Sequence, residues 1–259
     1  MKKYFVVSDV HSFYDQMVEA LNNAGFDYNN PDHILISCGD LLDRGPSPIQ
    51  CLDFVNGLPD DRKILITGNH EDLLRLCIDL SKLEEHDYHN GTAMTMYQLA
   101  TQSQSKDGKI NTGEMFDLAK KNKKIKEYFD KLVDYAEIED YIFVHGWIPC
   151  YASTFKGRHT YSFDPEWRSG NWIIARWTNG MEAWHSGVVV RGKTIVCGHW
   201  HCSFGNSKYH NDGMEFPNRY STNPEHRRAN FNPFIDNGIV ALDACTVYSK
   251  KINVFTFER

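Results

Sequence analysis

Three short apolar runs in the first part of the chain each end in a polar motif and each precede a helical pattern. These units are Lys3 to Ser8 with Asp9-Val10-His11, His33 to Ser37 with Gly39-Asp40, and Arg62 to Thr67 with Gly68-Asn69-His70-Glu71. Short β-branched runs of this kind indicate buried strands. Repeated strand–loop–helix units favour a parallel or mostly parallel sheet covered by helices, which is an α/β fold.

Two further apolar runs also end in histidine-containing motifs. Tyr141 to Val144 precedes His145-Gly146, and Thr194 to Cys197 precedes Gly198-His199-Trp200-His201. Open α/β sheets gather their ligands at the carboxyl ends of strands, so we expect all five loops at one edge. The last apolar runs, Gly238 to Leu242 and Lys251 to Phe257, indicate closing strands that we expect to be antiparallel.

We expect one domain over residues 1–259, since this length suits a single α/β domain with a large core. The polar, lysine-rich stretch at about 83–140 is predicted to be an inserted helical cap, with ordinary surface helices as the alternative. An exposed loop is expected at Ser103 to Thr112. The stretch at about 202–236 lacks periodicity and is predicted to be a long loop.

Composition narrows the class of partner and the cellular compartment. The net charge is -6 and no basic block stands out, so specific nucleic-acid binding is not expected, although a local basic site remains possible. Seven cysteines without a Cys-x-x-Cys pair are typical of reduced thiols, and we expect a cytoplasmic protein. The apolar run before Ser8 is too short for a signal core, and no run suits a membrane helix. The oligomeric state is not indicated.

Seven polar side chains at the strand ends form a candidate metal site: Asp9, His11, Asp40, Asn69, His145, His199 and His201. Carboxylates, imidazoles and one amide suit Mn²⁺, Fe or Zn²⁺ better than Ca²⁺. Seven ligands exceed the needs of one tetrahedral ion but fit two ions that share one carboxylate, and we interpret Asp40 as the bridge. Two ions about 3.5–4 Å apart would acidify a bridging water and clamp an in-line displacement.

Each motif alone has an ordinary structural explanation. An isolated Asp-x-His is typical of a turn, and Gly-Asn-His-Glu could simply begin a helix. Their joint occurrence, each directly after an apolar strand, is hard to explain without a site.

The ordered motifs resemble those of the calcineurin-like metallophosphoesterase superfamily. The matching residues are Asp9-Val10-His11, Gly39 to Gly45, Gly68 to Glu71, His145-Gly146 and Gly198 to His201. The resemblance implies a two-sheet β-sandwich core flanked by helices with an inserted helical cap, classed as α/β or, in some schemes, α+β. The Asp43-Arg44-Gly45 ending resembles the branch of serine/threonine protein phosphatases and symmetrical diadenosine tetraphosphatases.

The resemblance also implies two metal-ligand sets and a metal-bridging hydroxide as the nucleophile. One set is Asp9, His11, Asp40 and His201, and the other is Asp40, Asn69, His145 and His199. The Asp-Arg-Gly branch usually has proline in place of His201, so His201 either binds metal or faces the substrate. The expected cofactors are two divalent ions, Mn²⁺ first, with Fe, Zn²⁺ or Ni²⁺ as alternatives.

Catalytic and phosphate-binding roles follow from the same resemblance. His70 would be the general acid, and Asp43 would hold its ring and keep it protonated. Arg44 would bind the phosphate in bidentate fashion. Arg176 is the first candidate for a second clamp, with Arg168 and Arg191 as alternatives.

The expected function is that of a metal-dependent phosphatase, with a serine/threonine protein phosphatase as the first hypothesis. The substrate would be a phosphorylated protein or a small phosphoester. The alternative is a symmetrical bis(5'-nucleosyl)-tetraphosphatase, and a non-catalytic scaffold is the rival from another class. One or two of the aromatic residues Trp147, Tyr151, Phe155, Tyr161, Trp167 and Trp172 could stack on a nucleobase.

Overall fold

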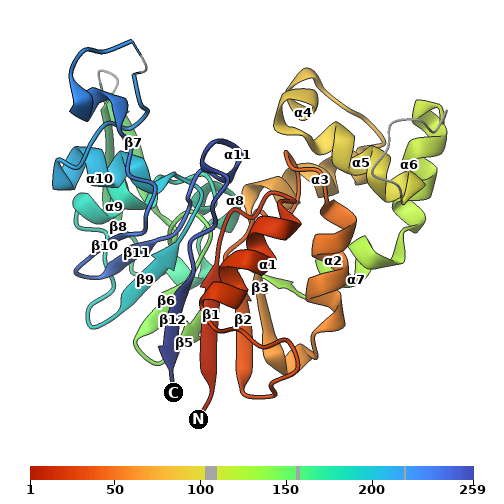
Figure 1. Cartoon of the computed structure of the whole chain (residues 1–259), viewed down its shortest axis with the longest axis horizontal. Helices are drawn as coiled ribbons and strands as arrows, with labels where there is room; N and C mark the ends of the chain where they lie inside the picture. Colours follow the sequence, from red (N-terminus) through yellow and green to blue (C-terminus); the bar gives the residue numbers. More distant parts are fainter. Residues whose placement is uncertain (103–109, 156–157, 219) are drawn as a thin grey trace.

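Two five-stranded sheets form the centre of the molecule (Figure 1). The computed structural model describes residues 1–102, 110–155, 158–218 and 220–259. The first sheet has the order β12-β1-β2-β3-β4 and the second has the order β10-β11-β9-β6-β5. Their bounds are β1 Lys3–Val7, β2 His33–Ser37, β3 Lys63–Ile66, β4 Leu132–Val133, β5 Ala136–Ile138, β6 Tyr141–Phe143, β9 Thr194–Cys197, β10 Phe234–Asp236, β11 Ile239–Ala241 and β12 Phe255–Glu258.

Parallel pairing dominates the middle of each sheet. β1 to β4 pair in parallel in the first sheet, and β6, β9 and β11 pair in parallel in the second. β12 is antiparallel to β1, as expected. The other closing strand corrects the expectation, because β11 runs parallel to β9 and antiparallel only to the edge strand β10.

Alternate residues of each strand face different layers, and all of these layers are apolar. In β1, Val6 points between the two sheets, whereas Phe5 and Val7 point to the helices. In β6, Phe143 likewise lies between the sheets and Ile142 lies on the helix side. Strands covered on both faces need continuous apolar sequences, which explains the runs seen in the sequence. Periodicity alone predicted a single sheet; the second sheet agrees with the family resemblance.

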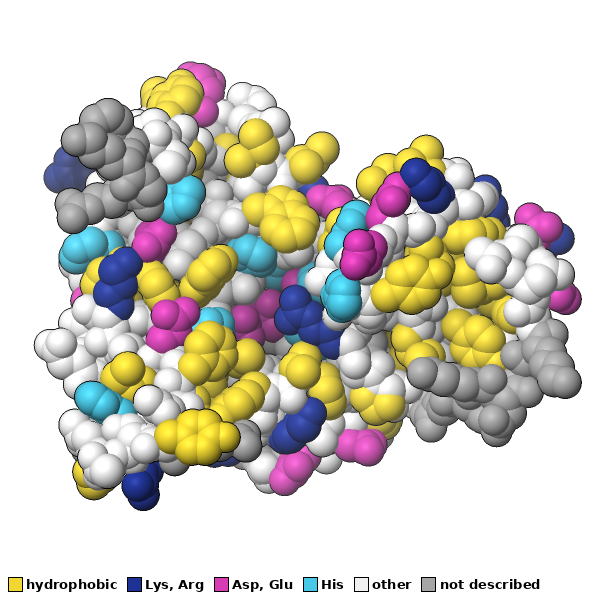
Figure 2. All heavy atoms as spheres, turned by 90° about the horizontal axis from the view of Figure 1, so that it is seen from above, with side chains coloured by type: hydrophobic (Ala, Val, Ile, Leu, Met, Phe, Trp, Pro, Cys, Tyr) yellow, Lys and Arg dark blue, Asp and Glu magenta, His cyan; other side chains and the backbone are white. Residues whose placement is uncertain are grey.

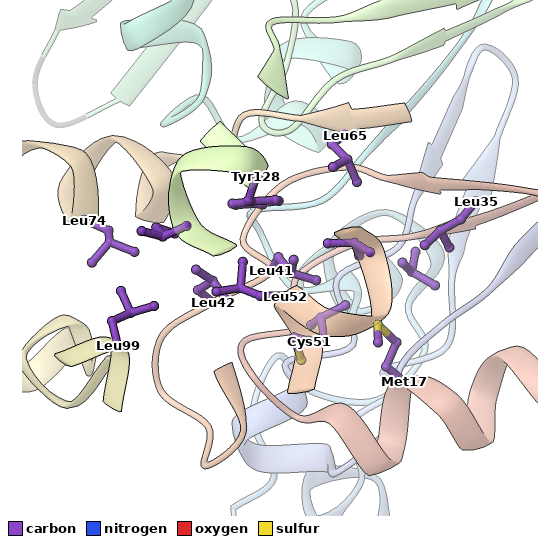
Figure 3. Packing of buried hydrophobic residues seen from close by; sticks show 14 of the residues in the cluster. Met17, Leu35, Leu41, Leu42, Cys51, Leu52, Leu65, Leu74, Leu99 and Tyr128 are labelled. Carbon is purple, nitrogen blue, oxygen red and sulfur yellow. The ribbon is translucent and has the colours of Figure 1, made fainter. Parts of the chain in front are cut away.

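Helices cover both outer faces of the sandwich (Figure 1). On the first sheet the cluster of Figure 3 joins strand residues such as Leu35 and Leu65 to Met17, Leu52 and Leu74 of the helices. The helices of the first half are α1 Tyr14–Asn23, α2 Pro48–Gly57, α3 Asn69–Leu80, α4 Glu85–Asn90, α5 Thr92–Thr101, α6 Thr112–Lys121 and α7 Lys123–Asp130. Those of the second half are α8 Trp172–Ala175, α9 Gly180–His185, α10 Cys202–His210 and α11 Thr246–Ser249.

The predicted cap at about 83–140 is helical only as far as α7. The chain then enters β4 in the first sheet and, after two residues, β5 in the second. Buried residues of α5 and α7, such as Leu99 and Tyr128, belong to the same core cluster as the strands (Figure 3). These two helices therefore pack on the same core as the first sheet. Most of the loop expected at Ser103 to Thr112 lies outside the described residues.

The predicted loop at about 202–236 is wrong in part, because it contains α10 and β10. The sequence of α10 is polar and lacks a helical apolar period, so its pattern gave no signal. Tertiary packing accounts for the helix, since a Cβ on Gly205 would lie 2.4 Å from Met181 Sδ and 2.8 Å from the Phe234 ring.

The structure also adds a hairpin of β7 (Cys150–Phe155) and β8 (Arg158–Phe163) that the sequence did not predict. All seven cysteines are free thiols. Among the described residues, no helix has the length and apolar character needed to cross a bilayer.

Replacement of Phe143 tests the layer between the sheets. Phe143 is fully buried and stacks with Phe257 at 5.7 Å between ring centroids. We expect Phe143→Ala to lower the free energy of unfolding by about 3–5 kcal/mol, because it leaves a cavity in a layer closed on both sides. Urea denaturation measures the change. Phe163→Ala, at a 40% exposed ring in β8, should cost less than about 1 kcal/mol; equal losses would contradict this account.

Candidate metal and phosphate site

Five loops meet at the carboxyl ends of the parallel strands, at the top of Figure 1. Three follow β1, β2 and β3 of the first sheet, and two follow β6 and β9 of the second. The predicted side chains therefore come from both sheets. Figure 2 looks down on this end and shows acidic, histidine and basic side chains gathered in its hollowed middle, between two raised parts.

The loops turn sharply as they leave the strands. Left-handed backbone angles occur at Asp9, Asp40, Asp43, Arg44 and His199, with φ values between 52° and 69°. Such angles are costly for residues other than glycine and persist only where the surroundings fix them. Here they turn the side chains toward one another.

Two glycines allow the loops to approach closely. A Cβ on Gly68 would lie 2.1 Å from Asp40 Oδ1, and a Cβ on Gly198 would lie 2.1 Å from Asp9 Oδ2. Any side chain at these positions would displace a carboxylate, which explains the glycines that precede Asn69 and His199.

Asp40 lies at the centre of the site and is only 2% exposed. Its Oδ1 accepts a hydrogen bond from the His70 backbone N–H at 3.0 Å and lies 3.4 Å from His145 Nε2. Its Oδ2 lies 3.7 Å from His11 Nε2. Burial would raise the pKa of Asp40, but the charges of His145 and His70 and the hydrogen bond with His145 outweigh it and hold the pKa well below the usual value.

Backbone carbonyls orient two of the imidazoles. His11 Nδ1 lies 3.1 Å from the Leu42 carbonyl oxygen, and His145 Nδ1 lies 2.8 Å from the Cys38 carbonyl oxygen. A carbonyl can only accept, so each Nδ1 carries a proton and each Nε2 points toward Asp40. Metal-binding histidines are commonly held in this way.

Two groups of described residues could each hold a metal ion, and they share Asp40. One group is His11, Asp40 and His70, and the other is Asp40, His145 and His199. Asn69 Oδ1 lies 2.8 Å from His145 Nε2, so the amide faces the second group. Asp9 lies between the loops after β1 and β9, since both of its oxygens accept from the His199 backbone N–H at 3.2 and 3.0 Å.

The electrostatics favour a cation in the second group. Burial should lower the pKa of His145, yet Asp40 and Asp9 raise it to about 10. The buried carboxylates thus draw positive charge to this point. Burial and the neighbouring His145 lower the pKa of His199 to about 3, which leaves its ring neutral and able to donate a lone pair. The donor types and the charge therefore fit a divalent ion.

His201 lies apart from the two groups. Its Nδ1 lies 2.8 Å from Ser203 Oγ, and its Nε2 lies 3.4 Å from Glu215 Oε1. Burial lowers the pKa of His201 to about 4. In this structure the His201 ring contacts Ser203 and Glu215 and lies outside the predicted ligand set.

His70, Asp43 and Arg44 form a connected unit beside Asp40. His70 Nδ1 lies 2.9 Å from Asp43 Oδ2. Arg44 Nη1 lies 3.0 Å from His11 Nε2, and Arg44 Nη2 lies 3.1 Å from His70 Nε2. Burial would lower the pKa of His70, but Asp40 and the bond to Asp43 outweigh it and raise the pKa.

Arg176, the first candidate for a second phosphate clamp, contacts two carboxylates. Its Nη1 donates to Asp72 Oδ2 at 2.6 Å and its Nη2 donates to Asp134 Oδ1, while the side chain is only 8% exposed. Two carboxylates already occupy the guanidinium, so Arg176 ties α3 to the segment between β4 and β5. Arg168 is exposed and pairs with Glu137.

The aromatic candidates also divide. Trp147, Trp167 and Trp172 are at most 8% exposed and pack in the core of the second half. The tryptophans beside the site are Trp177, 49% exposed, and Trp200, 37% exposed. Their rings lie 5.8 and 6.0 Å from the His199 ring, between centroids. The sequence analysis did not include Trp177 or Trp200 among its stacking candidates, although these two rings adjoin the site.

Glu71 has a structural role that the sequence motif did not indicate. From the sequence it was interpreted only as a residue that favours the start of a helix. Its Oε2 accepts from the backbone N–H groups of Asp40 and Gly68, each at 2.8 Å. Its Oε1 accepts from the Leu41 N–H at 3.0 Å and from the Tyr128 hydroxyl at 3.0 Å. One carboxylate thus joins the loops after β2 and β3 to α7. Only the glutamate at the helix start was visible in the sequence.

Comparisons with known proteins agree with this site. The family model of the calcineurin-like phosphoesterases matches residues 2–203. The chain therefore belongs to the calcineurin-like phosphoesterase family, and its fold is that of the family.

Two curated relatives are bis(5'-nucleosyl)-tetraphosphatases. The asymmetrical enzyme PrpE of Bacillus subtilis is 30% identical over 44% of this chain and 47% of its own length. The symmetrical enzyme of Buchnera aphidicola is 35% identical over 27% of this chain and 24% of its own length. The matched segment thus spans less than half of each relative.

Two solved structures share the fold along most of the chain. A putative diadenosine tetraphosphatase aligns with a TM-score of 0.52 and 16% identity, covering 99% of this chain and 89% of that one. A cold-active protein-tyrosine phosphatase of a Shewanella species aligns with a TM-score of 0.53 and 15% identity, covering 100% and 76%.

Removal of the Glu71 carboxylate should loosen the site loops. Glu71→Ala leaves three buried backbone N–H groups without an acceptor, so we expect a loss of about 3 kcal/mol or more in the free energy of unfolding. Tyr128→Phe removes only one donor and should cost about 1 kcal/mol. Urea denaturation of chelator-treated protein measures both. A smaller loss for Glu71→Ala than for Tyr128→Phe would overturn this role.

Proposed function

We propose that this protein is a metal-dependent phosphoric ester hydrolase that acts on dinucleoside polyphosphates. The observation that carries the chemistry is the Arg44 guanidinium, which lies within 3.1 Å of His11 and His70 beside the buried Asp40. A forked cation, an imidazole held by a carboxylate and a ligand cluster in one place suit phosphoryl transfer.

The metal cofactor of this proposal is a pair of divalent ions bridged by Asp40, with Mn²⁺ as the first candidate. His11, Asp9 and Asp40 would hold one ion, and Asp40, Asn69, His145 and His199 would hold the other. When bound, such ions neutralise charge on the phosphoryl oxygens and make water a better nucleophile. Imidazole, carboxylate and amide donors suit Mn²⁺, Fe, Zn²⁺ or Ni²⁺.

Three side chains of the chain would handle the phosphate and the proton. Arg44 presents two N–H groups in a plane and would bind two phosphoryl oxygens. In this structure Arg44 Nη2 points at His70 Nε2; once Arg44 binds the phosphate instead, His70 would give the proton on its Nε2 to the oxygen of the leaving group, and Asp43 would fix its Nδ1. The raised pKa of His70 supports this role, because a general acid must carry its proton near neutral pH.

The substrate class is supported by the relatives and by the rim of the site. Both curated relatives are named as bis(5'-nucleosyl)-tetraphosphatases. The half-exposed Trp177 beside His199 offers a flat apolar surface to a nucleobase. These observations support the dinucleotide over the phosphoserine or phosphothreonine substrate that the sequence alone favoured. The phosphoprotein stays the second candidate because the chemical step is the same.

Product analysis tests the function directly. We expect Mn²⁺-loaded protein to hydrolyse diadenosine tetraphosphate with a higher kcat/KM than a phosphothreonine peptide. Chromatography of the products distinguishes two ADP from AMP plus ATP. Asp40→Asn should lower turnover at least about 10³-fold, because it removes the shared ligand, and His70→Asn should lower kcat by about 10²–10⁴-fold. Chelation should abolish turnover.

Other outcomes have different meanings. Preference for the peptide would reverse the order of the two substrates. Hydrolysis of only a simple aryl phosphate would leave the chemistry intact and remove both substrates. Full activity of Asp40→Asn would refute the assignment of the site itself.

Loss of the Trp177 ring should change the preference between substrates. We expect Trp177→Ala to lower kcat/KM for diadenosine tetraphosphate by about ten- to a hundredfold, because base–aromatic stacking is worth about 1–3 kcal/mol. The loss for p-nitrophenyl phosphate should be smaller, since that substrate has no base. Steady-state kinetics measure the ratio. Phe163→Ala, at a 40% exposed ring on β8 that is not a stacking candidate, serves as the control and should leave the ratio unchanged; equal losses on both substrates with Trp177→Ala would exclude stacking.

A further inference from the structure

The loop that carries Asp43 and Arg44 is held in an unfavourable backbone conformation. Asp43 and Arg44 have φ values of 69° and 63°. Consecutive left-handed residues other than glycine require support from their surroundings. The Gly45 N–H donates to the Asp43 carbonyl oxygen at 2.6 Å, which makes the turn very tight.

One side of this turn rests on the loop after β1. A Cβ on Gly45 would lie 2.2 Å from the His11 carbonyl oxygen, and the Ser47 N–H donates to the Ser12 carbonyl oxygen at 3.0 Å. This contact fixes the turn against the first ligand loop. The side of the turn that carries the Asp43 carboxylate makes no part of this contact and is supported by another element.

The other side of the turn rests on the start of α5. A Cβ on Gly91 would lie 2.3 Å from the Arg44 backbone nitrogen and 2.7 Å from Arg44 Cα. Gly91 has a φ of 84°, and Thr92 follows it as the first residue of α5. Further along the helix, Gln98 Nε2 donates to the Pro46 carbonyl oxygen at 3.1 Å.

Thr92 reaches the catalytic pair itself. Its hydroxyl donates to Asp43 Oδ2 at 2.7 Å, and the same oxygen lies 2.9 Å from His70 Nδ1. Thr92 and Asp43 are both 0% exposed. Asp43 Oδ1 is buried and has no hydrogen-bond partner among the described residues, so Oδ2 carries the contacts that orient this carboxylate.

We propose that Thr92 is a positioning residue, which acts through Asp43 to hold the ring of His70 and the turn that bears Arg44. The proposal rests on the hydrolase function above. It gives the helical segment between β3 and β4 a part in the reaction: α5 fixes the proton donor and the phosphate-binding arginine in one orientation. Because Thr92 is fully buried, its hydroxyl would act through Asp43 and not directly on the substrate.

The test compares Thr92→Val, which keeps the shape of the side chain, with Thr92→Ser, which keeps the hydroxyl. We expect Thr92→Val to lower kcat about ten- to a hundredfold with a small change in KM, because a charge-assisted hydrogen bond and the ring orientation are lost. Thr92→Ser should recover to within about threefold of the wild type. Thr101→Val is the matched control, since that hydroxyl bonds to the Tyr97 carbonyl within α5.

A second background separates positioning from general damage. In the Asp43→Asn variant, Thr92→Val should lower kcat no further, because residues that act through one another are not additive. A further tenfold loss there would overturn the proposal. So would a Thr92→Val variant with wild-type kcat.

A spectroscopic readout does not depend on turnover. The His70 Nδ1 proton, hydrogen-bonded to Asp43, should give a downfield proton resonance that is absent in His70→Asn. We expect the resonance to weaken or move in Thr92→Val and to stay in Thr92→Ser and Thr101→Val. An unchanged resonance in Thr92→Val would refute the proposal. If the wild type hydrolysed no phosphoester but the resonance responded as expected, the proposed function would fail and the positioning contact would stand.

Discussion

The burial of the Asp40 carboxylate is the constraint around which the site is arranged. A carboxylate that is 2% exposed is costly unless positive charge and hydrogen-bond donors surround it. The His70 N–H supplies a donor, and the raised pKa values of His70 and His145 let their imidazoles supply positive charge. Because His70 follows β3 of the first sheet and His145 follows β6 of the second, this requirement is met only when the sheets pack in one register. Correct packing of the two sheets is therefore also what brings the functional residues together.

The chemistry of the site was more predictable from the sequence than its supports. Asp40, His145 and the other strand-end residues are visible because an apolar run precedes each of them and the motifs occur in a fixed order. The role of Glu71 was not visible, since its hydrogen bonds reach backbone groups that any sequence would supply. The sequence placed His201 among the ligands, but the structure places its ring against Ser203 and Glu215.

The errors in the fold have the same physical origin. The polar helix α10 lacks a periodic apolar face and depends on the close contact of Gly205 with Phe234. Arg176 was the first candidate for a second phosphate clamp, yet its charge is matched by Asp72 and Asp134, which are distant in sequence. A single sequence shows the local spacing of apolar residues and the type of each residue well. It does not report which distant charge or ring completes an environment.

The pairing of β1 with β12 has a consequence for how the chain is made. Lys3 pairs with Glu258, so β1 gains its second neighbour in the sheet only when β12, near the other end of the sequence, has been synthesised. Until β6, β9 and β11 have been synthesised, the inner faces of β1, β2 and β3 also lack the residues of the second sheet that cover them. A nascent chain with such an uncovered apolar face is prone to associate with other chains. Slow translation over the second half should therefore increase the demand for chaperones during synthesis, although the finished protein is fully packed.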